Sequence, residues 1–380
     1  MRLLHTSDWH LGRSLHRADL RDAQAAFLDS LVETARTERV DAVLVAGDIY
    51  DRAVPSVDAV ELCESALVRL RETGARVVLI SGNHDSARRL GFGSRLVDAA
   101  GVHLRTRLAA CADPIVLTDA HGPVAFYGVP YLEPEAVRED LPSDTGRGHA
   151  AVLGAALARV RADLAARGEV RSVVLAHAWV GSALGSDSER DLGGVGGVPS
   201  ALFDGFSYTA LGHLHGPQTL ADGLRYSGSP LAYSFSEARH RKGAWLVELS
   251  ASGLSAVEQV PAPVPRRLST ITGTLDELLT SAAHDAVADD WLQVTLTDAA
   301  RPDEAMSRLS RRFPQVLVLD WKPTSGGVDP RSYGARVSGR SDAEVAEAFV
   351  LHVRRTPATD AERALLAEAA EAVRVGAAVA

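Results

Sequence analysis

The sequence predicts an α/β fold, and three observations support that prediction. Short apolar runs at residues 2–4, 40–48 and 76–83 alternate with longer stretches in which apolar residues recur at helical spacing. The two later runs are β-branched and end in a glycine followed by polar residues. Hydrophobic residues make up 46% of the chain and charged residues 23%, which is typical of a globular protein. Strands and helices that alternate in this way form a mostly parallel sheet with crossover helices.

Two helices are expected between these strands. Phe27, Leu28, Leu31 and Val32 form one apolar stripe at helical spacing. Ser56 is placed to cap the second helix, whose stripe consists of Val60, Cys63, Leu67 and Leu70.

The middle of the chain is less regular but continues the same alternation. Residues 124–132, 171–178 and 207–215 read as strands, with an Ala-rich helix over about 148–167. Residues 224–234 and 244–250 are expected to be late strands of a second sheet.

A Pro-rich break at 260–267 marks a domain boundary, so we expect domains at 1–262, 263–338 and 339–380. The second has a strand-helix-strand-helix-strand pattern. In the third, the pairs Ser341/Glu344 and Thr359/Glu362 have capping-box spacing before amphipathic helices. Two short helices cannot bury both apolar stripes by themselves. They are expected to pack on the small domain or on another protein.

Composition excludes several classes of protein. No apolar run approaches the roughly 18 residues of a membrane span, and the N-terminus has no signal-peptide pattern. Two cysteines exclude a disulfide framework and fit a reducing cytoplasm. A net charge of -9 confines any nucleic-acid contact to a local surface or to a partner, and there is no P-loop motif for ATP.

Metal-ligand side chains follow successive predicted strands. Each alone has an ordinary explanation, because a strand end, a turn or a core histidine places the same residue types there. Together, on a sheet that brings strand ends to one edge, they predict a metal site. They are Asp8 and His10, Asp48, Asn83 with His84 and Asp85, His177, and His213 with His215.

This ligand set is sufficient for two ions only if one carboxylate is shared. Asp48 is the natural bridge, since its two oxygens can serve ions roughly 3.5–4 Å apart. Imidazole, carboxylate and amide donors suit manganese, iron or zinc better than magnesium.

The order D-x-H, G-D-x-x-D, G-N-H-D, single His and G-H-x-H resembles the calcineurin-like metallophosphoesterase superfamily. The blocks "GHLHGPQ" and "GSPLAYSFSEA" resemble one DNA-nuclease branch of it. The resemblance covers about residues 1–250. It implies a two-sheet sandwich flanked by helices, with a small α+β capping domain for DNA binding and C-terminal helices.

The resemblance also implies roles for individual residues. One ion would be held by Asp8, His10, Asp48 and His215, and the other by Asp48, Asn83, His177 and His213. His84 would face the phosphate as general acid or charge stabiliser, with Asp85 orienting its ring. Asp51 stands where archaeal and eukaryotic relatives have a histidine, so its role stays open.

The activity implied is that of a manganese-dependent DNA nuclease subunit in repair, replication and recombination. It would combine 3′-to-5′ exonuclease action on duplex ends with endonuclease action on hairpins and single strands. The implied partners are DNA, a coiled-coil ATPase docked on the terminal helices, and a second copy bound through the nuclease domain. Two alternatives remain open: a small-molecule or cyclic-nucleotide phosphodiesterase, and a DNA-tethering scaffold that has lost catalysis.

Basic residues beside the predicted metal edge are candidates for DNA phosphate contacts. Arg13 and Arg17 follow the first motif, and Arg88 and Arg89 follow "GNHD". Solvated helix faces are the competing explanation. The dense basic run at 239–243 is expected to be a solvated turn.

Overall fold

The computed structural model describes residues 1–189, 197–324, 339–354 and 356–379. These residues fall into two compact units, Met1–Lys322 and Pro323–Ala380, which are described separately. Residues 325–338 of the predicted small domain lie outside the described part of the chain. The boundaries predicted at 262/263 and 338/339 stay predictions.

The first sheet of the larger unit has the order β14-β13-β1-β4-β5-β6. Strands β1, β4, β5 and β6 are parallel, and β13 and β14 continue the sheet as antiparallel strands. The strands are β1 (Arg2–Thr6), β4 (Ala42–Val45), β5 (Arg76–Ile80), β6 (Val102–Arg105), β13 (Gly243–Ser250) and β14 (Gly253–Pro261).

The second sheet has the order β11-β12-β10-β9-β8-β7, with parallel pairing from β8 through β9 and β10 to β12. Its edge strands β7 and β11 pair antiparallel with their neighbours. The strands are β7 (Ile115–Asp119), β8 (Gly122–Val129), β9 (Arg171–His177), β10 (Tyr208–Gly212), β11 (Gln218–Ala221) and β12 (Leu224–Tyr226).

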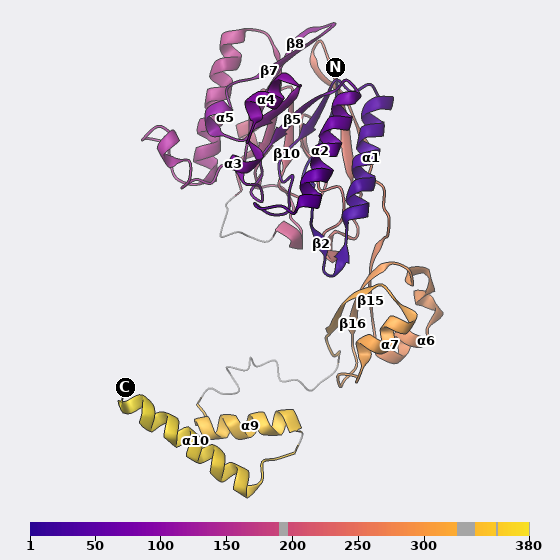
Figure 1. Ribbon diagram of the computed structural model, residues 1–380, viewed down its shortest axis with the longest axis vertical. Helices are drawn as coiled ribbons and strands as arrows, with labels where there is room; N and C mark the ends of the chain where they lie inside the picture. Colours follow the sequence, from indigo (N-terminus) through magenta and orange to yellow (C-terminus); the bar gives the residue numbers. More distant parts are fainter. Residues whose placement is uncertain (190–196, 325–338, 355, 380) are drawn as a thin grey trace. The chain divides into compact units, whose positions relative to one another are not determined.

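The two sheets pack face to face. Leu44 and Val78 of the first sheet and Phe126 and Leu175 of the second belong to one fully buried cluster. Side chains alternate along each strand, so the opposite faces are apolar as well and need helices to cover them. Helices α1 (Arg21–Thr37) and α2 (Val57–Glu72) cover the first sheet, and α5 (His149–Arg167) covers the second (Figure 1). The predicted sandwich flanked by helices is confirmed.

The helices form where the sequence predicts them. α1 buries Phe27, Leu28 and Leu31 on its predicted stripe, and the Ser56 side chain caps α2 by accepting a hydrogen bond from the Ala59 amide. The remaining short elements of this region are α3 (Ala87–Leu90), α4 (Ser94–Ala99) and the hairpin β2 (Ser14–Leu15) and β3 (Ala18–Asp19). Short 3₁₀ helices cover Leu108–Ala110, Arg138–Asp140, Asp187–Glu189, Ser200–Phe203, Phe235–Glu237 and Ala282–Val287.

The expectation that residues 224–234 and 244–250 are both strands of a second sheet is wrong in two respects. Only Leu224–Tyr226 forms a strand there, and residues 227–234 have no regular structure. Strand β13 instead joins the first sheet beside β1, where Leu3 pairs with Val247. Strand β1 has a free edge on the side away from β4, and β13 pairs with that edge. The expectation failed because periodicity alone does not reveal which sheet a late strand joins.

A small α/β layer completes the larger unit and has the predicted element order. Three parallel strands, β15 (Leu268–Gly273), β16 (Trp291–Leu296) and β17 (Val316–Trp321), alternate with α6 (Leu275–Thr280) and α7 (Ala305–Arg312). Thr274 and Glu277 form a reciprocal capping box at the start of α6. Leu278, Leu292, Val294 and Phe313 form a core of its own.

The second unit contains α9 (Asp342–Arg354) and α10 (Asp360–Val379). Both predicted capping boxes are present, since Ser341 and Glu344, and likewise Thr359 and Glu362, exchange side-chain and backbone hydrogen bonds. Phe349, Leu351 and Val353 of α9 are 56%, 47% and 60% exposed. Among the described residues no helix is both long and apolar enough to cross a membrane.

Candidate metal centre

The predicted ligands gather where strands of both sheets end. Asp8 and His10 follow β1, Asp48 follows β4 and Asn83 follows β5, all in the first sheet. In the second sheet, His177 ends β9, while His213 and His215 follow β10. The expectation that one sheet brings all of them to one edge is therefore wrong. The carboxyl ends of parallel strands in both sheets meet at the same end of the sandwich.

Glycines allow the two sheets to approach at this point. A Cβ at Gly212 would overlap the carbonyl oxygen of Ala46, and a Cβ at Gly47 would overlap the ring of His177. Gly47 also has a φ of 93°, which favours glycine. The glycines that precede Asp48 and His213 in the sequence motifs are thus needed for backbone approach.

Four predicted ligands have a left-handed backbone, which is uncommon for residues other than glycine. The φ angles are 52° for Asp8, 45° for His10, 51° for Asp48 and 105° for His213. Such conformations persist where the surrounding structure imposes them, and they cluster at functional sites. Here the imposing contacts include the Asp8 amide donating to Gly47 O at 3.0 Å and the His10 amide donating to Asp48 O at 3.0 Å.

This geometry corrects one expectation from the sequence. Asp8 and His10 were expected to share a face as alternate residues of extended chain. Strand β1 ends at Thr6, and neither residue is extended. The loop after the strand brings their side chains together.

The first group of donors consists of Asp8, His10 and His215. One ligand atom from each lies within 4.8 Å of the others. The Nε2 atoms of His10 and His215 lie 3.1 Å apart, and His10 Nε2 lies 3.6 Å from Asp48 Oδ2. All of these side chains are buried.

The second group is arranged around Asn83. Its Oδ1 lies 2.9 Å from His177 Nε2 and 3.0 Å from His213 Nδ1. Asp48 Oδ2 lies 3.5 Å from His177 Nε2, so the same carboxylate oxygen faces a histidine of each group. This is the position that a bridging carboxylate requires.

The donor set fits divalent metal ions. Ring nitrogens, carboxylate oxygens and an amide oxygen converge here, and all of these side chains except those of Asn83 and His213 are buried. His177 donates its Nδ1 proton to Ala46 O at 2.8 Å, so Nε2 is the ring atom that faces Asp48. Histidines that bind metals are oriented in this way. The cluster is therefore suited to hold divalent metal.

The pKa shifts of His10, His213 and Asp48 favour the protonation states that bind metal. Burial lowers the pKa of His213 to about 3 and holds that of His10 well below its ordinary value, so both rings are neutral near pH 7. Burial opposes the charged form of Asp48, but His177 outweighs it and holds the pKa of this carboxyl well below its usual range. Burial opposes the charged form of His177 as well, but the Asp48 carboxylate outweighs it and raises the pKa of this ring to about 9, so a metal ion at this position would replace a proton of His177.

His84 lies at the rim of the cluster. Its ring centroid is 4.6 Å from that of His10, and its backbone amide donates to Asp48 Oδ1 at 2.9 Å. The ring Nδ1 lies 2.9 Å from the backbone carbonyl oxygen of Asp51, which accepts its proton. Nε2 is therefore the ring atom left for a substrate.

The contacts of Asp85 correct the orienting role expected for it. Its carboxylate accepts hydrogen bonds from the amides of Ile49 (3.1 Å), Tyr50 (3.0 Å) and Gly82 (2.9 Å). These contacts connect the loops after β4 and β5 that carry Asp48 and Asn83. Because the Asp51 carbonyl holds the ring of His84, the role of Asp85 is to support the loops.

The four candidate arginines divide into two kinds. Arg17, Arg88 and Arg89 are exposed. Arg13 is engaged within the protein, because its guanidinium lies 5.0 Å from the centre of the Tyr233 ring and its Nε lies 3.7 Å from Asp51. Their contact with DNA stays a prediction.

Sequence reasoning missed two residues behind His215. Glu237 is fully buried and its Oε1 lies 3.2 Å from His215 Nδ1; Lys242 Nζ donates to His215 O at 2.8 Å. The expectation of a solvated turn at 239–243 is therefore wrong for Lys242, which is 7% exposed. A signal was present, since Lys242 and Lys322 are the only lysines in a chain whose other basic residues are arginines.

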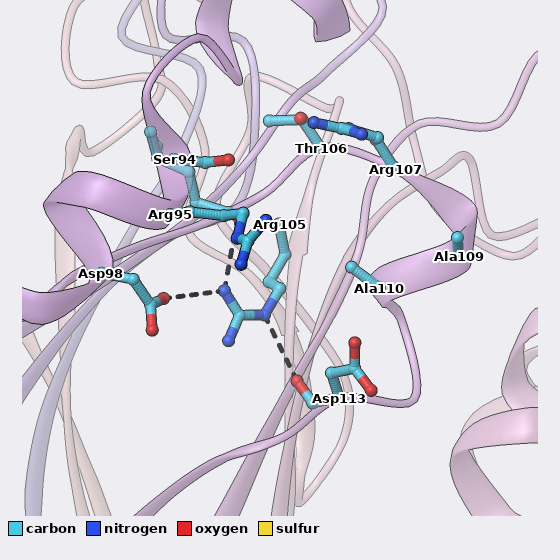
Figure 2. Close-up of a pocket in the computed structure, with 10 residues that line it drawn as sticks. Ser94, Arg95, Asp98, Arg105, Thr106, Arg107, Ala109, Ala110 and Asp113 are labelled. Atoms are coloured by element: carbon cyan, nitrogen blue, oxygen red, sulfur yellow. Dashed lines mark hydrogen bonds and ion pairs between the residues drawn. The ribbon is translucent and has the colours of Figure 1, made fainter.

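A cavity of about 450 Å³ lies elsewhere, over α4 and β6. Figure 2 shows Arg105 within it, ion-paired with Asp98 at 3.0 Å and donating to the Asp113 carbonyl. Its lining includes Arg95 and Arg107 but none of the predicted metal ligands. The metal cluster is thus distinct from this cavity.

Comparison with protein families agrees with the site. Residues 1–179 match the family model of the calcineurin-like phosphoesterases, which ends just past His177. Residues 264–354 match the SbcD_C model, described as the Type 5 capsule protein repressor C-terminal domain. The first match shows that residues 1–179 form a calcineurin-like phosphoesterase domain, and the chain is a metal-dependent hydrolase. Together the two matches support an SbcD-like protein.

The solved structures that are similar to this chain have low sequence identity to it. The protein TT1561 of Thermus thermophilus is 16% identical, with a TM-score of 0.40, over 68% of this chain and 98% of that one. A dimetal phosphatase from Danio rerio is 15% identical, with a TM-score of 0.43, over 69% and 99%. GAP50 of Plasmodium is 12% identical, with a TM-score of 0.43, over 86% and 99%. Similarities this low carry no information about the substrate of this chain.

Proposed function

We propose that this chain is the nuclease subunit of an SbcCD-type complex and cleaves DNA phosphodiester bonds with two divalent ions, which we take to be manganese. The observation that supports this best is the shared position of Asp48, whose Oδ2 faces His10 at 3.6 Å and His177 at 3.5 Å. One carboxylate between two donor groups is the arrangement of a dinuclear phosphoesterase site.

Seven side chains would hold the ions. Asp8, His10, Asp48 and His215 form one site, and Asp48, Asn83, His177 and His213 form the other. When bound, the ions supply Lewis acidity to the phosphate and activate water near neutral pH. The buried walls of the cluster exclude bulk water, which strengthens electrostatic contacts with the substrate.

His84 would protonate the leaving alkoxide of the DNA strand. The Asp51 carbonyl holds its Nδ1 proton, so the proton that reaches the substrate comes from Nε2. A positioned general acid of this kind typically contributes about 10²- to 10⁴-fold to the rate. The backbone amide of His84 keeps its hydrogen bond to Asp48 Oδ1 during the reaction. The ring of His84 would therefore transfer the proton, while its backbone positions the Asp48 carboxylate.

DNA as the substrate is supported by the SbcD_C match and by exposed basic residues near the site loops. Arg17, Arg88 and Arg89 are available for phosphate contacts, with the small domain over 263–338 adding DNA contacts of its own. We propose 3′-to-5′ exonuclease action on duplex ends and endonuclease action on hairpins and single strands. Such a nuclease would serve DNA repair, recombination and replication in the cytoplasm.

Exposed apolar side chains support two protein partners. Phe349, Leu351 and Val353 of α9 would dock an SbcC-like coiled-coil ATPase. Phe92 and Leu96, which are 89% and 79% exposed, would contribute to a homodimer through the nuclease domain.

The test is to incubate the protein with manganese and end-labelled duplex or hairpin DNA, with and without the ATPase subunit. Shortening of the duplex and opening of the hairpin are expected, and Asp48→Asn should abolish both. A wild-type complex that left both DNAs intact but hydrolysed a simple phosphodiester would favour the small-molecule phosphodiesterase instead.

A further inference from the structure

A buried acid–base pair that the proposed mechanism does not use lies directly behind His215. Glu237 and Lys242 have side chains 0% and 5% exposed, and they form an ion pair. Lys242 Nζ also donates to Ser229 Oγ at 2.8 Å. Burying two charges costs free energy unless both are fully paired, so a pair retained here calls for an explanation.

Both members of the pair contact His215, at different atoms. Glu237 Oε1 lies 3.2 Å from the ring Nδ1. Lys242 Nζ donates to the backbone carbonyl oxygen of His215 at 2.8 Å, and the Ser229 amide donates to the same oxygen at 3.2 Å. Glu189 accepts a hydrogen bond from the His215 amide. The ring and the backbone of His215 are thus held by separate contacts.

The contact with Glu237 determines which ring nitrogen faces the cluster. A carboxylate accepts, so Nδ1 carries the proton and Nε2 carries the lone pair. Nε2 is the atom that lies 3.1 Å from His10 Nε2. Without Glu237 the ring would lose both its tautomer preference and its rotational restraint.

His177, in the other group, is oriented differently. Its Nδ1 proton goes to the backbone carbonyl of Ala46 at 2.8 Å, a contact that no substitution of a neighbouring side chain removes. The two groups therefore differ in what orients a histidine: a backbone atom orients His177, whereas a side chain that substitution can remove orients His215.

We propose that Glu237 is a positioning residue for His215, held in place by Lys242, and that the pair sets the affinity of one metal position and not the other. This inference rests on the proposed two-metal centre. Substitution of the pair should weaken the ion bound by Asp8, His10 and His215, while the ion bound by Asn83, His177 and His213 keeps its affinity.

The experiment measures Mn²⁺ binding to the full chain by electron paramagnetic resonance of free Mn²⁺ and by calorimetry. Two variants are needed. Glu237→Gln keeps the shape but leaves Lys242 unpaired, whereas Glu237→Leu combined with Lys242→Met replaces the pair by apolar side chains of similar size and preserves folding. Circular dichroism in chelator checks the fold of each.

The expected result is that one of two Mn²⁺ ions binds about 10- to 100-fold more weakly in both variants, with the other unchanged. Asp119→Asn combined with Arg171→Met is the matched control. It removes a different, partly buried ion pair, with side chains 15% and 8% exposed, and should leave both affinities as in wild type.

Two outcomes would overturn the inference. Wild-type affinity for both ions in a folded double variant, or equal weakening of both ions, would show that the pair does not select one position. Wild-type protein that failed to bind two Mn²⁺ ions would overturn the proposed metal centre and this inference with it. Two-ion binding without DNA cleavage would contradict only the proposed substrate.

Discussion

The Nε2 atoms of His10 and His215 lie 3.1 Å apart although 205 positions separate the two residues in the sequence. His10 comes from a loop after the first sheet, and His215 from a loop after the second. Each histidine points its ligating atom at the other, which is the arrangement expected when both bind one ion. Substitutions at the two positions can therefore test the ligand assignment.

If His10 and His215 serve the same ion, their substitutions should not be additive. We expect His10→Asn to weaken one Mn²⁺ ion at least about tenfold, and the double variant with His215→Asn to lose no second ion. Combining His10→Asn with His213→Asn should weaken both ions. Calorimetric titration of Mn²⁺ measures this, and retention of one tight ion in the His10/His213 double variant would contradict the assignment.

Asp48 should matter to both ions. Asp48→Asn removes the charge of an oxygen that faces His10 and His177 within 3.6 Å, so we expect both Mn²⁺ affinities to fall together. Asp22→Asn, at an exposed carboxylate in the first turn of α1, is the control. Selective loss of a single ion in Asp48→Asn would show that this carboxylate does not bridge.

His84→Ala should separate catalysis from metal binding. The substitution removes the ring but keeps the backbone amide that donates to Asp48 Oδ1, so the carboxylate stays in place. We expect cleavage of labelled DNA to fall by about 10²- to 10⁴-fold with Mn²⁺ affinity unchanged. His16→Ala, at an exposed histidine, should have neither effect. If Mn²⁺ binding disappeared together with activity, His84 would be a ligand.

His5 should make the free energy of unfolding depend on pH. It is fully buried between the sheets, with Nδ1 2.9 Å from Tyr208 Oη and Nε2 3.1 Å from Leu211 O. Burial lowers its pKa from 6.5 to about 3, so between these pH values the unfolded chain binds a proton at His5 that the folded chain does not bind. The contribution of neutral His5 to the free energy of unfolding is therefore complete above pH 6.5. It is lost as pH falls toward 3, by up to about 1.4 kcal/mol per pH unit.

Urea unfolding in chelator at several pH values, compared between wild type and His5→Gln, isolates the contribution of His5 from the other titrating groups. The difference in unfolding free energy between the two proteins should shrink as the pH is lowered from 6.5. A difference that stayed constant between pH 7 and pH 4 would rule out His5 as the source.

Local structure was predictable because its causes are local. Ser56, Ser341 and Thr359 cap helices by contacts within three residues, and the stripe of Phe27 and Leu31 follows from helical period alone. The strand preceding each candidate ligand was predictable for the same reason. The destination of β13 was not, since pairing with β1 is a contact between the two ends of the domain.

The candidate ligands could be named from residue type and order, yet the reasoning about their geometry failed in three places. Two sheets, and not one, supply the ligands. Asp8 and His10 converge through left-handed backbone and not through strand alternation. Asp85 supports loops by accepting three backbone hydrogen bonds, a role that its place beside His84 does not reveal.

The sequence by itself determined the element order, the helix caps and the residue types available for metal binding, because these depend on short-range periodicity and side-chain chemistry. Only the tertiary structure decided that two sheets, and not one, supply the donors, and that Asp48 faces both groups. It also placed Glu237 and Lys242 behind His215. Contacts between distant segments depend on how sheets pack and where their strand ends meet, and no local pattern encodes that meeting point.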